Sequence, residues 1–460
     1  MAVGELRTGR GHDVTRALFG GVRPSLFVDL YELTMAAAYH ATGRTGPATF
    51  EVSVRSLPHE RNFLVACGLE DLLEAVRDWR FDADDVDYLR SLGQFSEDFL
   101  GHLAAIQFTG SIRAVPEGEV VFAGEPLVEI TAPVIEAQLL ETLVLNIIGT
   151  ETMQASKAAR IAIACGDRSF VDFSARRDHG VAAAIGAARA ALIAGASATS
   201  LVEAGCRLGV ALSGTMAHAY VMSFDDERDA FRTFARTFPG NAVLLLDTWD
   251  TVQGAHHAVD VARELRREGI SIDGVRLDSG DLAALARKVR SILDEGGLSD
   301  VQILASGDLD EHVIGALVAD GAPIDGFGVG TRMGTSEDAP SLGVVYKLVG
   351  DDRGPKLKLS EGKATLPGRK QIHRAEDHDV VCLAGEPCDG RALLEPIVES
   401  GRRLTAPPTL AEMHGRCAAS VGALPPRLRS IQPAAPPYEV RVSARLHALV
   451  DELTAVHSVG

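Results

Sequence analysis

Short hydrophobic stretches alternate with helix-like periodicity through the middle of the chain, from about Val134 to Val349. Each stretch is rich in β-branched residues and precedes a polar or glycine turn and then a run with helical spacing. Strands that alternate with helices at this interval predict a parallel sheet, either open or closed into a barrel. The predicted strands are Ser169–Phe173, Ala242–Asp247, Gly274–Asp278, Val301–Ser306 and Asp325–Gly330.

Three helical segments of this region are also visible in the pattern. The segment Val134–Cys165 predicts one or two long helices. Asp308 is expected to cap the helix that follows it, because Glu311 three residues later would complete a capping box. The helix after Asp281 is expected to bury one apolar stripe, formed by Leu282, Leu285, Val289 and Ile292.

The regions on either side have a different pattern. Before residue 133, Ala48–Arg55 alternates like a strand, Leu69–Trp79 has helical spacing, and Ser111–Ala132 predicts short strands broken by turns. After residue 350 the chain is richer in Pro and Gly, and it ends in a predicted helix, Ser443–Val456. Four parts are therefore predicted: a flexible tail, 1–20; an N-terminal α+β domain, 21–133; an α/β-barrel catalytic domain, 134–349; and a C-terminal segment that completes the scaffold, 350–460.

Composition narrows the classes of function. The chain has 460 residues and a formal net charge of -18, which argues against nucleic acid as a partner because binding its phosphates requires clustered Lys and Arg. No stretch approaches the roughly 20 apolar residues of a membrane helix, and Met1–Arg16 lacks the apolar core of a signal peptide. The six cysteines include no CxxC pair, so they are expected to be reduced and buried in a cytoplasmic protein.

Polar residues follow each predicted strand. In barrels of alternating strands and helices, the carboxyl ends of the strands and the loops after them form the active site. Glycines let a ligand approach the backbone, and helix N-termini attract anions. One such turn is ordinary N-cap chemistry, whereas five in series favour a site for a small anionic ligand. The residues concerned are Ser174, Arg176, Arg177, His179, Thr248, Asp250, Ser279, Gly280, Asp281, Gly307, Asp308 and Thr331.

Particular residues suggest particular chemistry. His218 follows a glycine turn near a predicted helix start, so a catalytic role is as plausible as a structural one. Arg176 would suit a carboxylate if it pointed into the barrel mouth, although adjacent arginines are more often surface charge. Gly307–Asp308 and Gly326–Thr331 could present backbone N–H groups to a phosphate. The residues alone thus indicate a barrel enzyme for an anionic, phosphorylated small molecule.

Seven segments, in this order, carry a family resemblance: DLYELTM from Asp29, FEVSVRSLPHERNFLVACGLE from Phe50, DFSARRDHG from Asp172, GTMAHAYVMSF from Gly214, VRLDSGDL from Val275, FGVGT from Phe327 and SLGVVYKLV from Ser341. Together they resemble the nicotinate phosphoribosyltransferase family. The resemblance implies an irregular α/β barrel with a second α+β, β-sandwich-like domain that is built from N- and C-terminal segments.

A reaction and its partners are also implied by the resemblance. Nicotinate would be joined to 5-phosphoribosyl 1-diphosphate, giving nicotinate mononucleotide and diphosphate. ATP would be a co-substrate whose hydrolysis drives the synthesis through a phosphohistidine at His218. Mg²⁺ would accompany the diphosphate. Because the family is dimeric, a homodimer with shared active sites is implied.

Residue roles are implied by the matching positions in the family's motifs. Tyr31, from the second subunit, and Phe173 would sandwich the pyridine ring, and Arg176 would hold the substrate carboxylate. His218 and Asp278 would be catalytic, and Asp278 is also a candidate magnesium ligand. The remaining implied residues are Arg276 for the ribose or its magnesium, Gly307, Asp308, Gly330 and Thr331 for the 5-phosphate, and Arg55 for the diphosphate across the interface.

Several assignments stay open. The phosphohistidine needs a partner on its other ring nitrogen, and either Asp250 or Asp278 could serve. The role of His179 is open. The neutral segment Ser197–Ser200 favours nicotinate over nicotinamide, because nicotinamide-specific relatives use an acidic residue near this position. A quinolinate phosphoribosyltransferase would need more cationic side chains for two carboxylates, and a non-catalytic barrel that binds a pyridine nucleotide would not need His218.

Overall fold

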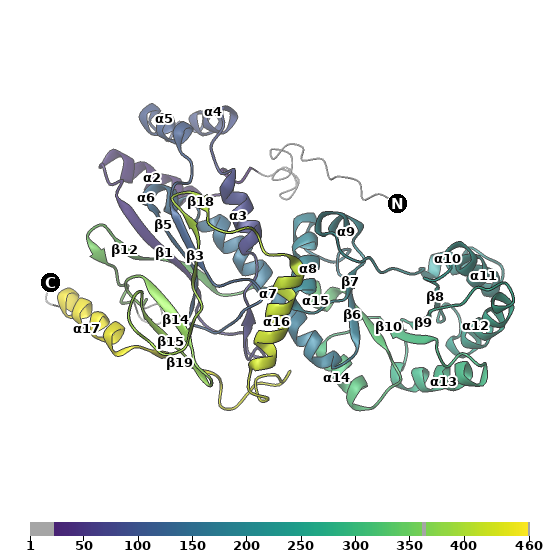
Figure 1. Ribbon diagram of the computed structural model, residues 1–460. Helices are drawn as coiled ribbons and strands as arrows, with labels where there is room; N and C mark the ends of the chain where they lie inside the picture. The colour runs from purple at the N-terminus through teal and green to yellow at the C-terminus, as the bar shows by residue number, and fades with distance from the viewer. Residues whose placement is uncertain (1–22, 361–364, 459–460) are drawn as a thin grey trace. The chain divides into compact units, whose positions relative to one another are not determined.

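The structure, a computed structural model, describes residues 23–360 and 365–458, so the predicted tail, 1–20, lies outside the described residues. The chain forms two compact units (Figure 1): unit 1 contains the residues up to 153, 341–428 and those from 433, and unit 2 contains 154–340 and 429–432. The first boundary falls inside the long helix α7 (Glu141–Cys165). The second precedes strand β12 (Val344–Asp351), which pairs within unit 1. The boundaries thus lie at 153 and 340, where the sequence pattern suggested 133 and 349.

Unit 2 contains a six-stranded sheet in which every strand pair is parallel. Its hydrogen-bonded order is β7-β6-β11-β10-β9-β8, with β7 and β8 at the two ends (Figure 1). The α/β class and the five predicted strands are confirmed, and β7, two residues long, is too short to give a sequence pattern. The strands are β6 (Ser169–Asp172), β7 (Ala198–Thr199), β8 (Val243–Leu245), β9 (Gly274–Leu277), β10 (Gln302–Ala305) and β11 (Gly326–Val329).

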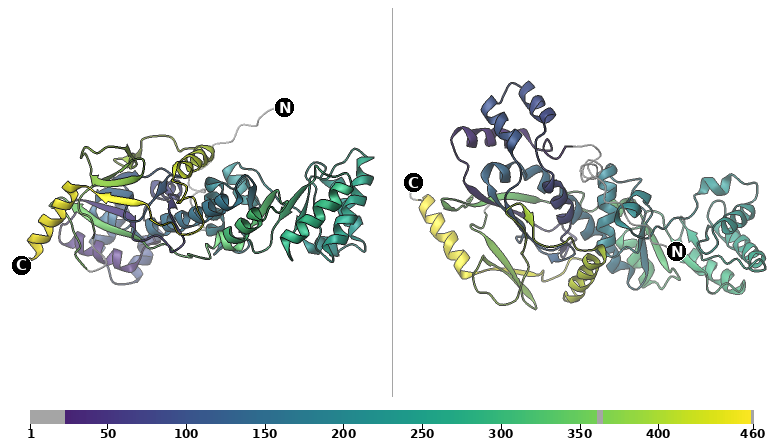
Figure 2. Two further views of the ribbon diagram at one scale, coloured as in Figure 1. Left: turned by 90° about the horizontal axis from the view of Figure 1, so that it is seen from below. Right: turned by 45° about the horizontal axis from the view of Figure 1, so that its top comes forward.

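Helices connect successive strands of this sheet. The strands are largely apolar, and Val275, Leu277 and Ile303 are fully buried, as expected for strands of a parallel sheet. Helices α11, α12 and α13 pack side by side (Figure 2). The helices of unit 2 after α7 are α8 (Val181–Ala194), α9 (Val202–Leu208), α10 (His218–Met222), α11 (Glu227–Thr237), α12 (Thr251–Arg266), α13 (Leu282–Glu295), α14 (Glu311–Ala319) and α15 (Thr331–Gly334).

Two helix predictions need correction. The side chain that caps α14 is Asp310, which accepts hydrogen bonds from the backbone N–H groups of His312 at 3.0 Å and Val313 at 2.8 Å. Asp308 lies two residues earlier with a φ of 49°, so it shapes the left-handed turn and does not cap the helix. In α13 the predicted stripe is rotated around the helix, because the fully buried side chains are Ala286, Val289 and Leu293.

Unit 1 is built on a seven-stranded antiparallel sheet of order β13-β12-β1-β5-β3-β17-β18. Strand β12 pairs with β1, and β17 pairs with β3, so the last part of the chain extends the sheet that the first part begins. The strands are β1 (Pro47–Val54), β3 (Ser111–Ala114), β5 (Pro126–Pro133), β13 (Gly354–Pro355), β17 (Glu395–Glu399) and β18 (Arg402–Arg403), with β12 as above.

A second, four-stranded sheet of unit 1 has the order β16-β14-β15-β19, and helix α17 contacts its strand β15 (Figure 2). Its strands are β14 (Lys370–Arg374), β15 (His378–Leu383), β16 (Arg391–Ala392) and β19 (Glu439–Val442), and β2 (Leu64–Val65) pairs separately with β4 (Val120–Val121). The helices are α2 (Leu30–Ala41), α3 (Leu69–Arg77), α4 (Ala83–Ser91), α5 (Glu97–Ala105), α6 (Val134–Gln138), α16 (Leu410–Ala423) and α17 (Ala444–Ser458).

A buried ionic cluster lies at the four-stranded sheet. Arg374 on β14 donates to Asp379 on β15 at 2.6 Å and to Glu119 at 2.9 Å, and both carboxylates are buried. The Tyr438 hydroxyl donates to Asp379 at 2.9 Å. Burial alone lowers the pKa of Arg374, but its hydrogen bonds to Asp379 and the charges of Glu125 and Glu119 outweigh burial and raise it. Arg374 is therefore a structural cation, held by carboxylates that need it.

The cysteines only partly match the prediction. All six are free thiols, but Cys206 is exposed and Cys388 is half-buried, whereas Cys67, Cys165, Cys382 and Cys417 are buried. Throughout residues 23–360 and 365–458, the helices are too short or too polar to cross a membrane.

Candidate active site

The carboxyl ends of the six parallel strands lie at one edge of the unit 2 sheet, where strand-end chemistry was expected. Of the eleven predicted site residues, nine lie in unit 2, at this edge or next to it. They are Phe173 and Arg176 after β6, Arg276 in β9 and Asp278 after it, Gly307 and Asp308 after β10, Gly330 and Thr331 after β11, and His218 at the start of α10.

His218 lies between partners from two neighbouring strands. Its Nδ1 is 3.2 Å from the Thr248 Oγ1, and its Nε2 is 3.7 Å from the Asp278 Oδ2. Thr248 follows β8 and Asp278 follows β9, so the parallel pairing of these strands places one partner on each ring nitrogen. The His218 side chain is 41% exposed, which leaves the imidazole accessible to a ligand.

Asp278 is held in place by its neighbours. Ser306, after β10, donates its hydroxyl to the Asp278 Oδ1, and the Asp278 backbone N–H donates to the Asp247 Oδ2 at 3.1 Å. The Ser279 hydroxyl donates to the same Asp247 oxygen at 2.5 Å. The other Asp247 oxygen, Oδ1, is buried and has no hydrogen-bond partner among the residues that the structure describes. The carboxyl groups of Asp278 and Asp247 are thus both held by hydrogen bonds, and the Asp247 Oδ1 is left without a partner among the described residues.

Arg276 is a half-buried cation whose hydrogen-bond partners are neutral. Its guanidinium donates to the Thr215 Oγ1 at 2.9 Å and to the backbone oxygen of Met216 at 3.0 Å. Its Nε–H is buried without an acceptor in the described part of the chain. Burial lowers the pKa of Arg276 and outweighs the opposing charge of Asp278. A guanidinium with an unused donor in such a place is suited to an anionic ligand.

Phe173 and Arg176 lie in the loop after β6. The Phe173 N–H donates to the backbone oxygen of Val329 at 2.8 Å, and its ring packs over Gly328 in β11. A Cβ at Gly328 would lie 2.4 Å from the Phe173 Cε2, so the ring can occupy this position only over a glycine. Arg176 is exposed. The loop therefore offers a half-buried aromatic ring and an exposed guanidinium close together in sequence.

The turns after β10 and β11 bring backbone to the same edge. Gly307 has a φ of 98°, and a Cβ there would lie 2.0 Å from the backbone oxygen of Asp278, so glycine is required. Asp308 follows in a left-handed conformation and is exposed. Gly330 and Thr331 are half-buried at the start of α15. These turns place exposed and half-buried backbone beside the carboxyl groups described above.

The other two predicted residues, Tyr31 and Arg55, lie in unit 1. Tyr31 is in the first turn of α2 and is 46% exposed, although an aromatic residue there is usually part of the core. Partial burial and the nearby charge of Glu141 raise its pKa. Arg55 follows β1 and lines a cavity of about 360 Å³ together with Glu51 and Lys347.

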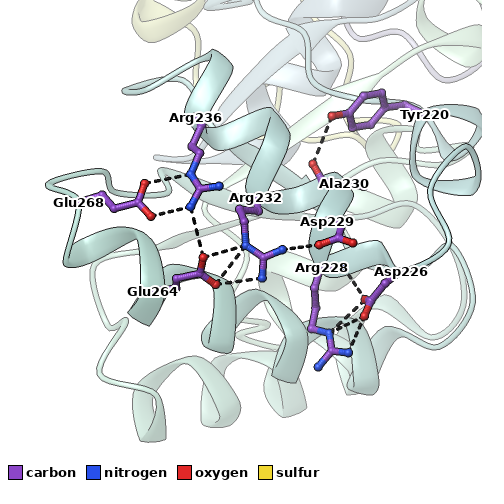
Figure 3. A network of polar contacts seen from close by, with 9 residues as sticks. All are labelled: Tyr220, Asp226, Arg228, Asp229, Ala230, Arg232, Arg236, Glu264 and Glu268. Atoms are coloured by element: carbon purple, nitrogen blue, oxygen red, sulfur yellow. Dashed lines mark hydrogen bonds and ion pairs between the residues drawn. The ribbon is translucent and has the colours of Figure 1, made fainter.

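A network of ion pairs and hydrogen bonds links helix α11 to its neighbours (Figure 3). Tyr220, on the same short helix α10, donates its hydroxyl to the backbone oxygen of Ala230 on α11 at 3.2 Å. Arginines of α11 then pair with one glutamate of α12, the helix that begins just after Thr248, and with a second glutamate just beyond its end. The pairs are Arg232–Glu264 at 2.9 Å and Arg236–Glu268 at 2.6 Å. The network therefore links the helix of His218 to the helix that follows its partner.

Some functional neighbours were missed by the sequence analysis. Asp250, one of the two suggested partners of the histidine, instead caps α12 and accepts from the Gln253 N–H at 2.7 Å. Thr248 takes the Nδ1 position, although it was noted only as a polar residue after a strand. Asp247, which accepts from the Asp278 backbone, and Ser306, which donates to the Asp278 carboxyl group, were not singled out. The signal that could have found all three is that each stands at the carboxyl end of a strand adjacent to β9.

Comparison with known proteins identifies the family. The model of the nicotinate phosphoribosyltransferase N-terminal domain matches residues 26–149. A nicotinate phosphoribosyltransferase of Mycobacterium tuberculosis is 46% identical over 428 residues, which cover 92% of each chain. The chain belongs to the nicotinate phosphoribosyltransferase family. The nicotinate phosphoribosyltransferase of Bacillus subtilis is 45% identical over 358 residues, covering 76% of this chain and 73% of its own.

Solved structures agree with this assignment to the nicotinate phosphoribosyltransferases. Human nicotinic acid phosphoribosyltransferase superposes with a TM-score of 0.83 at 29% identity, covering 92% of this chain and 99% of the human chain. The nicotinate-nucleotide pyrophosphorylase from Pyrococcus furiosus, at 23% identity and a TM-score of 0.72, shares the fold over 91% of this chain and 99% of its own. The family predicted from the sequence motifs is confirmed.

Proposed function

We propose that this protein joins nicotinate to 5-phosphoribosyl 1-diphosphate, forming nicotinate mononucleotide and diphosphate in NAD biosynthesis. The observation that carries the proposal is the placement of His218 between Thr248 and Asp278 at the strand edge of a member of this family. Departure of diphosphate builds positive charge at C1 of the ribose, and the nicotinate ring nitrogen attacks that carbon. The nitrogen is already a nucleophile, so the site must mainly orient the reactants and take up charge.

Nicotinate would bind at the end of β6. The Phe173 ring, seated on Gly328, supplies a stacking face, and the Arg176 guanidinium supplies a fork for the substrate carboxylate. The Asp172 carboxylate at the end of β6 is fully buried and accepts a hydrogen bond from the Thr199 hydroxyl at 2.7 Å. Because that carboxylate is already bonded inside the protein, its presence is compatible with an acid substrate.

The phosphoribosyl group would bind along β9, β10 and β11. Arg276 and Asp278 are proposed to contact the ribose, because the guanidinium has a donor without a partner among the described residues and Ser306 holds the Asp278 carboxyl group. The 5-phosphate would lie against the two turns whose backbone is open at the edge, since backbone N–H groups in such turns bind phosphate. The residues of those turns are Gly307, Asp308, Gly330 and Thr331.

We further propose that ATP phosphorylates His218. The γ-phosphoryl group would pass to an unprotonated ring nitrogen with release of ADP, and hydrolysis of the phosphohistidine would later restore the imidazole and release phosphate. A proton on Nδ1, donated to Thr248, leaves the lone pair on Nε2, the nitrogen nearer Asp278. The exposure of the imidazole allows the nucleotide to reach it.

Magnesium is proposed to accompany the diphosphate. The donor set fits this ion, because Mg²⁺ prefers oxygen ligands and commonly uses one or two carboxylates while substrate phosphates complete its shell. Asp247 offers a buried, unpartnered oxygen, and Asp278 lies beside it. When bound, the ion would take up charge of the departing diphosphate. The contribution of the chain itself is to hold these carboxyl groups through Ser279 and Ser306.

The working unit is proposed to be a cytoplasmic homodimer in which Tyr31 and Arg55 of one copy complete the site of the other. An exposed aromatic residue in a first helical turn supports this, because aromatic residues are enriched at interfaces. The sheet of unit 2 is proposed to curve into an irregular α/β barrel, and the parallel bridge between Thr199 and Leu212 extends it beyond β7. The sheets of unit 1 would form the β-sandwich-like second domain.

The substrate is tested by measuring transfer to nicotinate, nicotinamide and quinolinate in parallel. Nicotinate is expected to give the highest kcat/KM. Preference for nicotinamide or quinolinate would assign one of those activities instead. Tight binding of a pyridine nucleotide without turnover of any of the three bases would identify a non-catalytic binding protein.

The role of His218 is tested by its alanine variant. Replacing it should abolish stimulation by ATP and leave slow ATP-independent transfer, because the phosphoryl acceptor is lost while the substrate contacts remain. The matched control is His256→Ala, at an exposed position on α12. An unchanged ATP-stimulated rate in His218→Ala would rule out the phosphohistidine.

A further inference from the structure

The loop between β6 and α8 carries both proposed nicotinate ligands, Phe173 and Arg176, above a set of buried polar groups that the reaction does not use. Asp172 accepts hydrogen bonds from the Ser174 backbone N–H at 2.9 Å, from the Ser174 hydroxyl at 2.6 Å and from the Thr199 hydroxyl at 2.7 Å. Asp172 is fully buried, so these bonds anchor the start of the loop to β7.

The Ser174 hydroxyl has a second carboxyl neighbour. Its Oγ lies 3.0 Å from the Asp178 Oδ2, in addition to the 2.6 Å contact with Asp172. A hydroxyl group has a single proton and cannot donate to both oxygens. The shorter contact and the complete burial of Asp172 assign that proton to Asp172. The contact with Asp178 is then a hydrogen bond only if Asp178 carries a proton and donates it to Ser174.

The surroundings of Asp178 favour its protonated form. Its Oδ1 is buried with no hydrogen-bond partner among the described residues. Helix α15 packs so closely that a Cβ on Gly334 would lie 1.9 Å from that oxygen, and what α15 presents there is backbone. Burial is the largest cause of a raised pKa of Asp178, which lies at about 6. Asp172 favours the protonated form, whereas Ser174 and His179 oppose it.

We propose that protonated Asp178 is a positioning residue for nicotinate: it donates to Ser174, which donates to Asp172, and this relay holds the loop of Phe173 and Arg176 in place. The inference rests on the proposed function, because it takes nicotinate as the ligand of that loop. The relay also packs against α15, the helix that begins next to the proposed 5-phosphate turn. When Asp178 ionises, two carboxylates compete for one hydroxyl proton and the loop loosens.

The pH dependence follows from the direction of this shift. A carboxyl group whose pKa is raised on folding, here from 3.8 to about 6, stabilises the fold at low pH, and that contribution is lost as the pH rises through about 6. The KM for nicotinate should therefore rise across this range. Asp178→Asn retains an N–H donor toward Ser174 at every pH and should show no such rise.

The test compares Asp178→Asn, Asp178→Ala and the parent protein between about pH 5 and 8. The ratio of the parent's nicotinate KM to that of Asp178→Asn should increase with pH by about tenfold, the effect of losing one buried hydrogen bond. Ionisations of the substrates are common to both proteins and cancel in the ratio. Asp178→Ala should have a raised KM at every pH. The matched control, Asp167→Asn, at an exposed position in the turn before β6, should behave like the parent.

Two substrate-free measurements separate this inference from the proposed function. The Tm of the parent should fall relative to that of Asp178→Asn as the pH rises through about 6, and Asp178→Asn should lack the infrared carbonyl band of one protonated carboxyl group. A parent protein without transfer to nicotinate, but with both signatures, would contradict the proposed function and keep the relay. A constant KM ratio together with an unchanged infrared spectrum would overturn the relay even in an active enzyme.

Discussion

Two half-buried arginines show how differently the two units use charge. In unit 1, Arg374 donates to the carboxylates of Asp379 and Glu119, and these partners raise its pKa despite burial. In unit 2, Arg276 donates to a hydroxyl and a backbone oxygen, keeps one N–H without an acceptor in the described chain, and has a pKa lowered by burial. Arg374 is hydrogen-bonded to charged carboxylates, whereas Arg276 is hydrogen-bonded only to uncharged groups.

The difference separates scaffold from site. A buried charge that is fully paired contributes to the fold, and removing its partner is costly because the remaining charge stays buried. A buried charged group can instead have a donor or acceptor atom that bonds to nothing within the protein, and that atom is then available to bond a ligand. The unpartnered oxygen of Asp247 follows the same rule as the unpartnered Nε–H of Arg276, and both lie at the strand edge of unit 2.

The largest expected effect comes from removing Arg276, the arginine whose hydrogen-bond partners are uncharged. Arg276→Ala should lower kcat/KM by about 10²–10³, the usual cost of losing a preorganised donor at a reacting group. Its Tm should change little, because the partners left behind are neutral. Steady-state kinetics and thermal unfolding measure the two quantities, with Arg287→Ala on the surface of α13 as the control. Full activity in Arg276→Ala would break the link between incomplete pairing and function.

The complementary change removes Arg374, the arginine that donates to two carboxylates. Arg374→Ala should lower the free energy of unfolding by about 3–5 kcal/mol, because it leaves the buried Asp379 carboxylate without a cation, whereas Glu119 keeps Arg391 at 2.9 Å. The kcat of the protein that remains folded should match the parent. Urea titration and an assay at low temperature test this, with Arg353→Ala, whose side chain is 58% exposed, as the control. A loss of activity larger than the loss of folded protein would place Arg374 in the site.

A smaller effect is expected from changing Gly328, against which the Phe173 ring packs. Gly328→Ala should displace Phe173 and raise the KM for nicotinate about tenfold, because the added Cβ overlaps the ring edge. The KM for the phosphoribosyl donor should change less than about twofold. Gly101→Ala in α5, where a Cβ would meet open space, is the control. An equal rise in both KM values would mean that the whole strand edge moves and not the ring alone.

The smallest expected effect concerns the Thr248 hydroxyl group that contacts the His218 ring. Thr248→Val keeps the shape of the side chain and removes its hydrogen bond, so ATP stimulation should fall about fivefold, equivalent to about 1 kcal/mol. Transfer without ATP should be unaffected. The comparison variant is Thr237→Val, at an exposed hydroxyl that bonds within its own helix. No difference between the two variants would show that Thr248 does not orient the imidazole.

The parts of the molecule that local patterns determine were predictable from the sequence. Strand β9 has Val275 and Leu277 at alternate positions before a turn, and the glycine turn before His218 correctly indicated a helix start at that residue. The parallel arrangement followed from the alternation of strands with helices. Neither inference required knowledge of which strands are neighbours.

The rest of the site depends on neighbours that the sequence does not reveal. Asp250 looked like a partner for the histidine because it is close to Thr248 in sequence, but it points its carboxylate at its own helix. Asp310 and Asp308 are both acceptable caps by residue type, and only the left-handed turn at Asp308 decides between them. The bond from Thr199 to Asp172 was hidden for the same reason, because the pairing of β6 with β7 that brings the two residues together leaves no local pattern.

The arrangement of the seven-stranded sheet has a consequence during protein synthesis. Strand β1 lies between β5 and β12, yet Val344 of β12 emerges from the ribosome roughly 290 residues after Val54 of β1. At about 5–20 residues per second, this edge of β1 waits between about 15 and 60 s for its partner. Unit 2, which is nearly continuous in sequence, is translated within that interval. The newly made chain thus carries a strand with one unpaired edge while it waits, and such an edge is open to pairing with other chains.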